Sequence, residues 1–182
     1  MKLVVGLGNF GSEFDNTPHN VGFAAVDKLV SSMKLFFKKK KKKGLILETK
    51  FEDVDVMFVK PLTYMNNSGD CVYDLVKKFK VPLEDVCIVL DDVDLAAGLT
   101  RARPNGLAGT HNGLKSVTNR LGTTEFFRIR IGVDAPSRGS DLAEYVLRKM
   151  DRKTQELIDV GVEKAVELIK TFIVSGAMAE TK

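Results

Sequence analysis

Short apolar segments alternate with segments of helical periodicity along most of this chain, and no other feature limits the possible fold as strongly. Residues 2–5 are rich in β-branched side chains and end at Gly6, and residues 86–90 are apolar throughout, as is typical of buried strands. Between such segments apolar residues recur at spacings of three and four, which predicts amphipathic helices. The alternation predicts an α/β fold in which helices flank both faces of a twisted, mixed but mostly parallel sheet.

The expected elements follow from the same patterns. Residues 45–49 and 54–59 read as two strands that could form a hairpin around Glu52 and Asp53, with Pro61 closing the second strand. Asn67 or Ser68 is expected to cap the second helix, and Ser140 a short later one. Further strands are predicted at residues 99–103 and 127–133, and helices around 23–33, 72–79, 112–120, 140–147 and 158–172. Without a repeat or an interdomain linker, residues 1–182 are predicted to form a single domain.

The chain contains none of the roughly 18-residue apolar stretches that a membrane span requires. Its first residues turn at Gly6, too early for a signal peptide, so a cytoplasmic location is expected. Cys71 and Cys87 do not form a CxxC pair and are interpreted as small core residues.

The formal net charge of +4 comes mainly from the run Lys38–Lys43, since the other residues include 22 basic and 24 acidic side chains. We interpret the run as a solvated, mobile loop; contact with anionic phospholipid or RNA, helped by Phe36 and Phe37, is the alternative. A second bias is more informative, because residues 99–130 contain one acid, Glu125, and six basic side chains. That excess suits a phosphate backbone, with solvated surface as the competing interpretation. The six are Arg101, Arg103, Lys115, Arg120, Arg128 and Arg130.

Residues 6–11 satisfy the pattern GxGxxG after a strand, which invites a dinucleotide-binding interpretation. That interpretation requires a helix starting at the turn and an acidic residue at the end of the next strand. Pro18 delays the helix, and Asp27 falls in the middle of helical periodicity. The sequence therefore disfavours a nicotinamide or flavin cofactor.

The residues suited to chemistry gather behind predicted strands. The chain has two histidines, His19 and His111, each followed by asparagine, and Asn9, Asn66, Asp91 and Asn112 also follow strands. Sites in α/β sheets collect at the carboxyl ends of strands, so we expect these groups to meet. Imidazole can take a proton from water, a carboxylate can hold the ring, and asparagine amides can donate to a developing oxyanion.

Simpler interpretations exist for the same residues. Either histidine could be a surface or core residue, and Asn66 and Asn112 could cap helices. Asp91, Asp92 and Asp94 could form a solvated turn or hold a hard cation. No further cluster of ligands accompanies the three carboxylates, so no metal site is predicted.

Six blocks, in order and near the usual spacing, resemble the bacterial-type peptidyl-tRNA hydrolase family over essentially the whole chain. They are Gly6–Asn9, Thr17–Phe23, Pro61–Gly69, Asp91–Leu95, Gly109–Lys115 and Arg128–Gly132. The resemblance implies hydrolysis of the ester joining a peptide, or an N-blocked amino acid, to the terminal ribose of tRNA, by a monomer without a cofactor.

The resemblance also implies a role for each matching residue. His19 would activate water and Asp91 would support it, while Asn9 would help distinguish blocked from free amino groups. Asn66 and Asn112 would bind the peptide backbone or polarise the carbonyl. Phe14 and Tyr64 would line the substrate groove, and Arg103 and Arg130 would meet tRNA phosphates.

The chain departs from the family pattern near these residues. Phe10, Phe14 and Pro18 stand where proline, tyrosine and arginine are usual, and Leu107 and Thr110 replace serine and glycine. Two other functions stay open at this point: an RNA-binding protein of the same fold without hydrolysis, and a small-molecule esterase. Retention of His19 and Asp91 favours the hydrolase.

Overall fold

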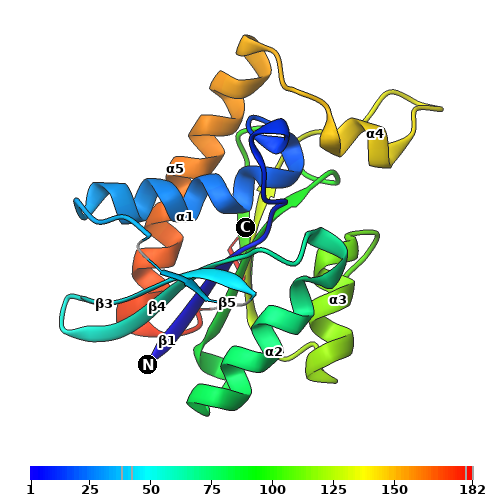
Figure 1. The fold of residues 1–182 in the computed structure, drawn as a ribbon. Coiled ribbons are helices and arrows are strands. Elements are labelled where there is room, and N and C mark those ends of the chain that lie inside the picture. The colour runs from blue at the N-terminus through cyan, green and yellow to red at the C-terminus, as the bar shows by residue number, and fades with distance from the viewer. Residues whose placement is uncertain (38, 42, 179, 182) are drawn as a thin grey trace.

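A computed structural model describes residues 1–37, 39–41, 43–178 and 180–181, with the backbone alone for residues 39–41. Its seven strands form one sheet in the order β2-β3-β4-β1-β5-β7-β6 (Figure 1). The central strands β4, β1, β5 and β7 are parallel, and the outer pairs β2–β3, β3–β4 and β6–β7 are antiparallel. Five of the seven strands therefore run in one direction, which confirms the predicted sheet. The strands are β1 Lys2–Gly6, β2 Lys39–Lys41, β3 Gly44–Phe51, β4 Val54–Pro61, β5 Val86–Asp92, β6 Thr100–Arg103 and β7 Phe127–Gly132.

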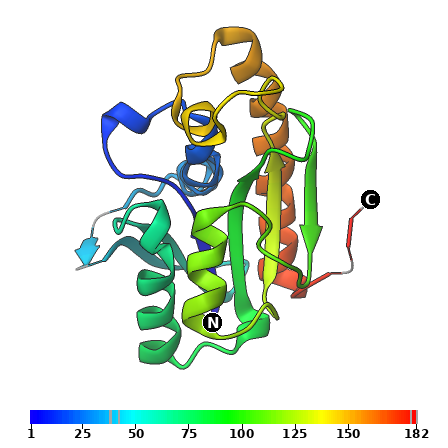
Figure 2. The ribbon, with the colours of Figure 1, turned by 90° about the vertical axis from the view of Figure 1, so that its right-hand side faces the viewer.

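Helices cover both faces of the sheet, as predicted. On one face, α1 (Val21–Ser32) and α5 (Arg152–Ser175) pack over a core that includes Val4. On the other, α2 (Ser68–Phe79) and α3 (Asn112–Leu121) pack over a core that includes Leu3 and Val5. Figure 2 shows strands between α2 and α3 on one side and α5 on the other. The short helix α4 spans Leu142–Leu147, and 3-10 turns η1 to η4 span Ser12–Phe14, Pro18–Asn20, Met65–Asn67 and Leu83–Asp85.

The glycines of the GxGxxG pattern allow α1 to lie close against the sheet. A Cβ on Gly6 would stand 2.3 Å from the carbonyl oxygen of Gly22. A Cβ on Gly22 would stand 2.4 Å from the oxygen of Val89 and 2.6 Å from that of Leu7. A Cβ on Gly8 would stand 2.7 Å from the Phe23 ring. Close packing thus accounts for Gly6 and Gly8 of the pattern without a bound phosphate, whereas Gly11 adopts a φ of 131°.

Two predicted helix caps differ from the structure. The side chain of Asp141, rather than Ser140, caps α4 by accepting a hydrogen bond from the Ala143 amide. Asn67 occupies the N-cap position of α2 but makes no capping bond with its side chain. Ser68 already belongs to the helix, and its hydroxyl donates to the Met65 carbonyl at 2.9 Å.

The lysine run is only partly the loop that its charge predicts. Residues Lys39–Lys41 form β2, paired with β3 at the sheet edge, so the loop interpretation is wrong for these three. Backbone pairing depends little on side-chain charge, and edge strands often carry lysine. Lys38 and Lys42 lie outside the described residues, and Lys43 forms an ion pair with Asp74 at 2.7 Å.

Other predictions hold. β3 and β4 form the predicted hairpin, and Glu52 and Asp53 at its turn adopt φ values of 45° and 66°. Cys71 and Cys87 are buried in the core; burial raises the pKa of Cys71 to about 12 and raises that of Cys87 further. In the described part of the chain, no helix combines the length and apolarity needed to cross a membrane.

Candidate active site

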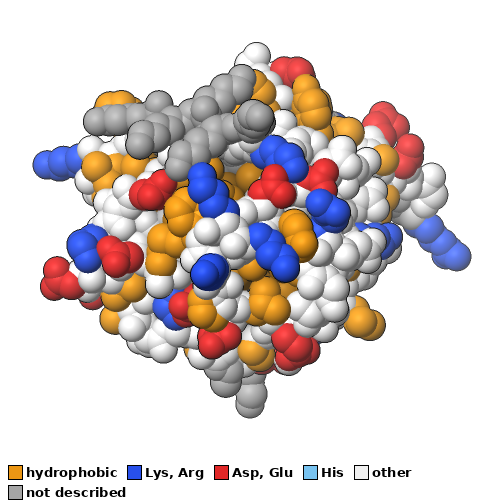
Figure 3. Space-filling model, turned by 60° about the horizontal axis from the view of Figure 1, so that its bottom comes forward, with side chains coloured by type: hydrophobic (Ala, Val, Ile, Leu, Met, Phe, Trp, Pro, Cys, Tyr) orange, Lys and Arg blue, Asp and Glu red, His pale blue; other side chains and the backbone are white. Residues whose placement is uncertain are grey.

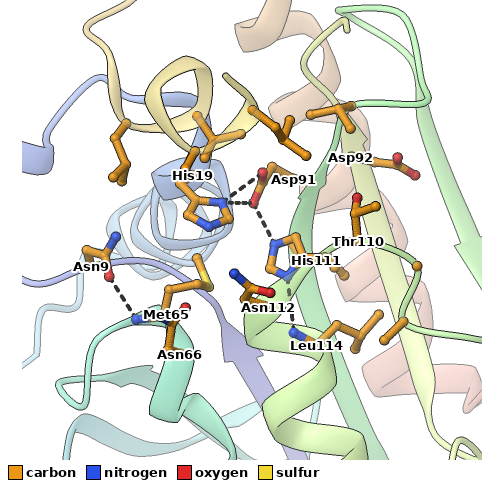
Figure 4. Close-up of a pocket in the computed structure, with 18 of the residues that line it drawn as sticks. Asn9, His19, Met65, Asn66, Asp91, Asp92, Thr110, His111, Asn112 and Leu114 are labelled. Atoms are coloured by element: carbon orange, nitrogen blue, oxygen red, sulfur yellow. Dashed lines mark hydrogen bonds and ion pairs between the residues drawn. The ribbon is translucent and has the colours of Figure 1, made fainter. Parts of the chain in front are cut away.

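A cavity of about 650 Å³ opens where β1, β4 and β5 end. Polar groups from six separate segments of the chain line it, among them Arg130 of β7 and Asp141 before α4, and Figure 4 shows part of this lining. The structure therefore brings together every predicted site residue except Arg103. Those that line the cavity are Asn9, Phe14, His19, Tyr64, Asn66, Asp91, Asn112 and Arg130.

His19 and Asp91 form the centre of the cavity. His19 lies in η2 directly before α1, and Asp91 lies near the end of β5 with 2% of its surface exposed. His19 Nδ1 is 2.9 Å from both carboxylate oxygens. Burial pushes the pKa of Asp91 up, but interactions with His111 and His19 outweigh it, so the pKa lies well below its usual range. An ionised Asp91 accepts a hydrogen bond from the Nδ1–H of His19, and the lone pair of His19 then lies on Nε2.

His111 makes a second contact with the same carboxylate, which the sequence did not predict. Its Nε2 is 2.8 Å from Asp91 Oδ1, and its Nδ1 accepts a hydrogen bond from the Leu114 amide at 3.1 Å (Figure 4). The two imidazole rings lie 4.9 Å apart between centroids. His111 thus does two things at once: it caps α3 with one ring nitrogen and supports Asp91 with the other. The one sequence signal for His111 was that both histidines are followed by asparagine. The cap gave no signal of its own, because histidine is not among the usual N-cap residues.

The strand-end argument for His111 is wrong, although the residue reaches the site. β6 is antiparallel to β7, with Thr100 opposite Ile131 and Arg103 opposite Arg128. Its carboxyl end therefore points away from the cavity. Residues 104–111 carry the chain back to the edge where Asp91 lies.

Asn9 is held from two sides. Its Oδ1 accepts a hydrogen bond from the Met65 amide at 2.7 Å. The side chain of Asn20, a buried residue that sequence reasoning missed, accepts from the Asn9 amide at 2.8 Å and donates to its carbonyl at 2.9 Å. These bonds leave the Asn9 side-chain NH₂ without a partner among the described residues, and it lines the cavity.

The contacts around Asn9 and Asp91 close into a loop, which we call the site ring. From His19 it passes through the adjacent Asn20 to Asn9, and then to Met65. The Met65 sulfur lies so close to Gly113 that a Cβ there would stand 2.3 Å from it. Gly113 belongs to the α3 turn capped by His111, and His111 and His19 both contact Asp91. Each member is therefore fixed by two neighbours.

Asn66 and Asn112 are exposed in the cavity. Asn66 lies inside η3 and Asn112 is the first residue of α3. Neither side chain forms a hydrogen bond within the described part of the chain, and His111 caps α3 instead. Their amides are thus available to a ligand, and the capping interpretation does not hold for either.

Two aromatic rings flank the amides. Phe14 and Tyr64 meet edge to face, with ring centroids 6.3 Å apart. The backbone of Tyr64 has φ 56° and ψ 163°. Residues other than glycine rarely adopt this conformation, and it is enriched at functional sites. The Phe14 loop is fastened from outside, because Lys149 Nζ donates to the carbonyls of Ser12, at 3.2 Å, and Asp15.

The positions that depart from the family pattern lie around this cavity. Pro18 is buried at the first position of η2, where its fixed φ suits a helical turn. Leu107 is 88% exposed and Thr110 is exposed, both lining the cavity. Phe10 is 46% exposed on the loop after β1. Leu107 thus places an exposed apolar side chain at the cavity rim.

The three neighbouring aspartates do not form a cation site. Asp92 pairs with Arg130 and accepts a hydrogen bond from the Asp94 amide at 2.9 Å. Ligand atoms of His19, Asp91 and His111 do lie within 4.8 Å of one another. A metal on His111 Nε2 would require a proton on Nδ1, because metal-bound histidines donate from the other nitrogen. The Leu114 amide already donates to that atom, so this cluster suits hydrogen bonding better than metal binding.

Most of the basic side chains between residues 99 and 130 already bind carboxylates or backbone carbonyls of the protein itself. Arg128 is 1% exposed and donates to the carbonyls of Gly106, Thr124 and Phe126, so its inclusion in a phosphate-binding set is wrong. Burial lowers its pKa to about 10. Arg103, Arg120 and Arg130 pair with Glu180, Asp70 and Asp92. Within the described residues, Arg101 and Lys115 have no acidic partner. Figure 3 shows basic and acidic side chains interspersed over the face it presents.

Comparisons with known proteins agree with this arrangement. The family model described as "Peptidyl-tRNA hydrolase" matches residues 3–182. A Staphylococcus saprophyticus protein of that name is 41% identical over 175 residues, which are 96% of this chain and 92% of that protein. A Thermoanaerobacter protein of the same name is 40% identical over 176 residues, covering 97% and 95%. The crystal structure of peptidyl-tRNA hydrolase from Acinetobacter baumannii superposes with a TM-score of 0.89 at 33% identity, covering 95% of this chain and 88% of that one.

Proposed function

Because the chain belongs to the peptidyl-tRNA hydrolase family, we propose that it cleaves the ester joining a peptide, or an N-blocked amino acid, to the 3′-terminal ribose of tRNA. The observation that carries the mechanism is the contact of His19 Nδ1 with both oxygens of Asp91, in a cavity lined by three asparagines. The reaction needs no covalent intermediate on the protein.

In this mechanism His19 is the general base. Its Nε2 takes a proton from water while the water oxygen attacks the ester carbonyl carbon. The bond between that carbon and the ribose oxygen then breaks, and the proton passes from the imidazolium to the ribose oxygen. Asp91 holds the ring in the required tautomer and stabilises the positive charge that it gains.

The asparagines and the aromatic rings bind the substrate. The free amides of Asn66 and Asn112 donate to the carbonyl oxygen as it becomes negative, or to the peptide backbone. Asn9, with its NH₂ in the cavity, distinguishes a blocked from a free amino group. Phe14 and Tyr64 form a wall of the groove.

Other parts of the proposal concern the partners. Arg130, at the cavity, and Arg103, on β6, would meet phosphates of tRNA after exchanging their present carboxylate partners. We also propose that residues 1–182 act as one domain and as a monomer in the cytoplasm, without a cofactor. The basis is the continuous sheet and the completeness of the site within one chain.

Replacing His19 by alanine tests the base. We expect kcat on N-acetyl-aminoacyl-tRNA to fall by about 10²–10⁴, the usual contribution of a general base. Binding of the uncleaved substrate should stay near the wild-type value, and the protein should remain folded, with a lower melting temperature because buried Asp91 loses a partner. The measurement is release of N-acetyl-amino acid by the wild type and by His19→Ala under the same conditions.

Two results would contradict the proposal. Near-normal turnover by His19→Ala would assign the base to another residue. Wild-type protein that binds tRNA but releases no amino acid would leave the RNA-binding function in place of hydrolysis.

A further inference from the structure

We propose that His111 is a positioning residue for the reaction, held neutral by the turn that it caps, which orients Asp91 for His19 and cannot serve as a second base. The inference rests on the proposed function, in which Asp91 supports His19. It assigns separate roles to two histidines that contact the same carboxylate.

The protonation of His111 follows from its two partners. A backbone amide can only donate, so His111 Nδ1, which faces the Leu114 amide at 3.1 Å, must present a lone pair. Asp91 has no partner other than the two imidazole rings among the described side chains, and a carboxylate can only accept from them, so His111 Nε2, 2.8 Å away, must carry the proton. One proton on Nε2 and none on Nδ1 define a neutral ring in a single tautomer.

That tautomer prevents His111 from acting as a base. Its single lone pair is occupied by the Leu114 amide. A second proton on Nδ1 would face that amide N–H and break the cap of α3, which leaves a donor of the first helical turn unpaired. The ring is 11% exposed, which limits replacement of the lost bond by water.

The same tautomer fixes the orientation of Asp91. Oδ1 accepts hydrogen bonds from both His111 and His19, whereas Oδ2 contacts His19 alone. No other described side chain donates to this carboxylate. Without the His111 bond, rotation of the carboxylate would be limited by His19 alone, the group that it is meant to orient.

The His111 bond also affects the charge that His19 experiences. A donor on Oδ1 shares the negative charge of Asp91, so removing it leaves more of that charge to stabilise the imidazolium form of His19. The active form of the base is the neutral ring. Loss of the bond should therefore move the acidic limb of the kcat/KM profile to higher pH.

Two substitutions separate the bond to Asp91 from the helix cap. In His111→Asn the amide oxygen takes the place of Nδ1 and can still accept from the Leu114 amide, but the side chain is too short to reach Asp91. In His111→Gln the terminal amide takes the place of Nε2 and can donate to Asp91, while the capping atom is lost. Asp151→Ala is the control for cap loss, because Asp151 caps α5 by accepting from Thr154 at 2.8 Å, away from the cavity.

We expect kcat of His111→Asn to fall about tenfold, as for the loss of one hydrogen bond to a charged group. Its acidic limb should move to higher pH. His111→Gln should melt lower, as Asp151→Ala does, with kcat within about threefold of wild type and an unshifted limb. Asp151→Ala should lose stability alone.

Several results would overturn the inference. Wild-type kcat and pH profile in His111→Asn would show that the bond to Asp91 does not position the base. A loss of kcat in His111→Gln alone, without a shift of the limb in either variant, would reduce His111 to a structural cap. If His19→Ala stays active, the assignment of His19 as the base fails, and the inference with it. Wild-type protein that releases no amino acid would refute the proposed function itself. An inactive His19→Ala beside an unaffected His111→Asn refutes the inference alone.

Discussion

At the scale of single residues, three buried side chains show how surroundings set chemistry. Burial alone raises the pKa of Cys87, so its thiol stays protonated. Asp91 is as deeply buried, yet two imidazole contacts hold its pKa below the usual range. Arg128 stays charged in the core because three backbone carbonyls accept its N–H groups. Specific partners, rather than depth, decide which buried groups remain ionised.

The cysteines offer a direct test of this contrast. Because burial raises the pKa of Cys71 to about 12 and that of Cys87 further, neither thiol should react with a thiol reagent such as Ellman's reagent in native protein at pH 8. Two thiols per chain should react once guanidinium unfolds the protein. Rapid stoichiometric labelling of the native protein would show that the surrounding core opens readily.

At the scale of elements, the approach of α1 to the sheet governs where His19 lies. Gly22 is the second residue of α1 and packs against the carbonyls of Leu7 and Val89. His19 stands three residues before it, so any displacement of this helix end displaces the His19 ring from Asp91. The glycines of residues 6–22 therefore serve the site through packing.

Gly22→Ala should show this constraint. Helix propensity alone would favour alanine by about 1 kcal/mol. Backbone carbonyls 2.4 and 2.6 Å from the new Cβ cannot move away cheaply, so we expect a net loss of about 2–3 kcal/mol in the free energy of unfolding, with lower kcat. Denaturant melts of Gly22→Ala and of the exposed control Ala24→Gly, which should lose about 1 kcal/mol, make the comparison. A stabilised Gly22→Ala would refute the close packing.

Elements were predictable from the sequence where their own pattern determines them. The apolar run 86–90 and the helical spacing of residues 158–172 report burial directly, and both elements formed. The pairing of Lys39–Lys41 and the reversed direction of β6 depend on neighbouring strands, which no local pattern encodes. The cap by His111 was missed for a similar reason, because the position of His111 is set by residues 104–111, which lead the chain back to the edge of the sheet where Asp91 lies.

At the scale of the whole molecule, segments distant in the sequence converge on one cavity. Residues 9–20, 64–67, 90–94 and 107–114 all contribute to it, and sequence reasoning found most of them because strand ends share an edge. The surroundings of the basic residues were less predictable. Counting basic residues could not reveal that Arg128 is buried or that three other arginines have carboxylate partners.

Salt dependence should report the phosphate contacts that remain. We expect tRNA affinity to fall linearly on a double-logarithmic plot against salt concentration. Arg101 and Lys115 have no acidic partner among the described residues and lie in the same basic stretch as the proposed phosphate ligands Arg103 and Arg130. Arg101→Gln and Lys115→Gln should each reduce the slope by about 1. Lys153→Gln, on the exposed first turn of α5, is the control and should leave the slope unchanged. Salt-independent binding would instead fit a small-molecule esterase.

The site ring has a consequence for anyone who would transplant this chemistry. Each member of the site ring is fixed by contacts with two others. Copying His19 and Asp91 alone into a foreign scaffold would leave out Asn20, Met65 and Gly113, which fix the positions of the site loops. The smallest unit that could be grafted is thus the whole site ring with the strand ends that carry it. The His19–Asp91 pair grafted without the site ring would have the same side-chain atoms but would lack the contacts that orient them.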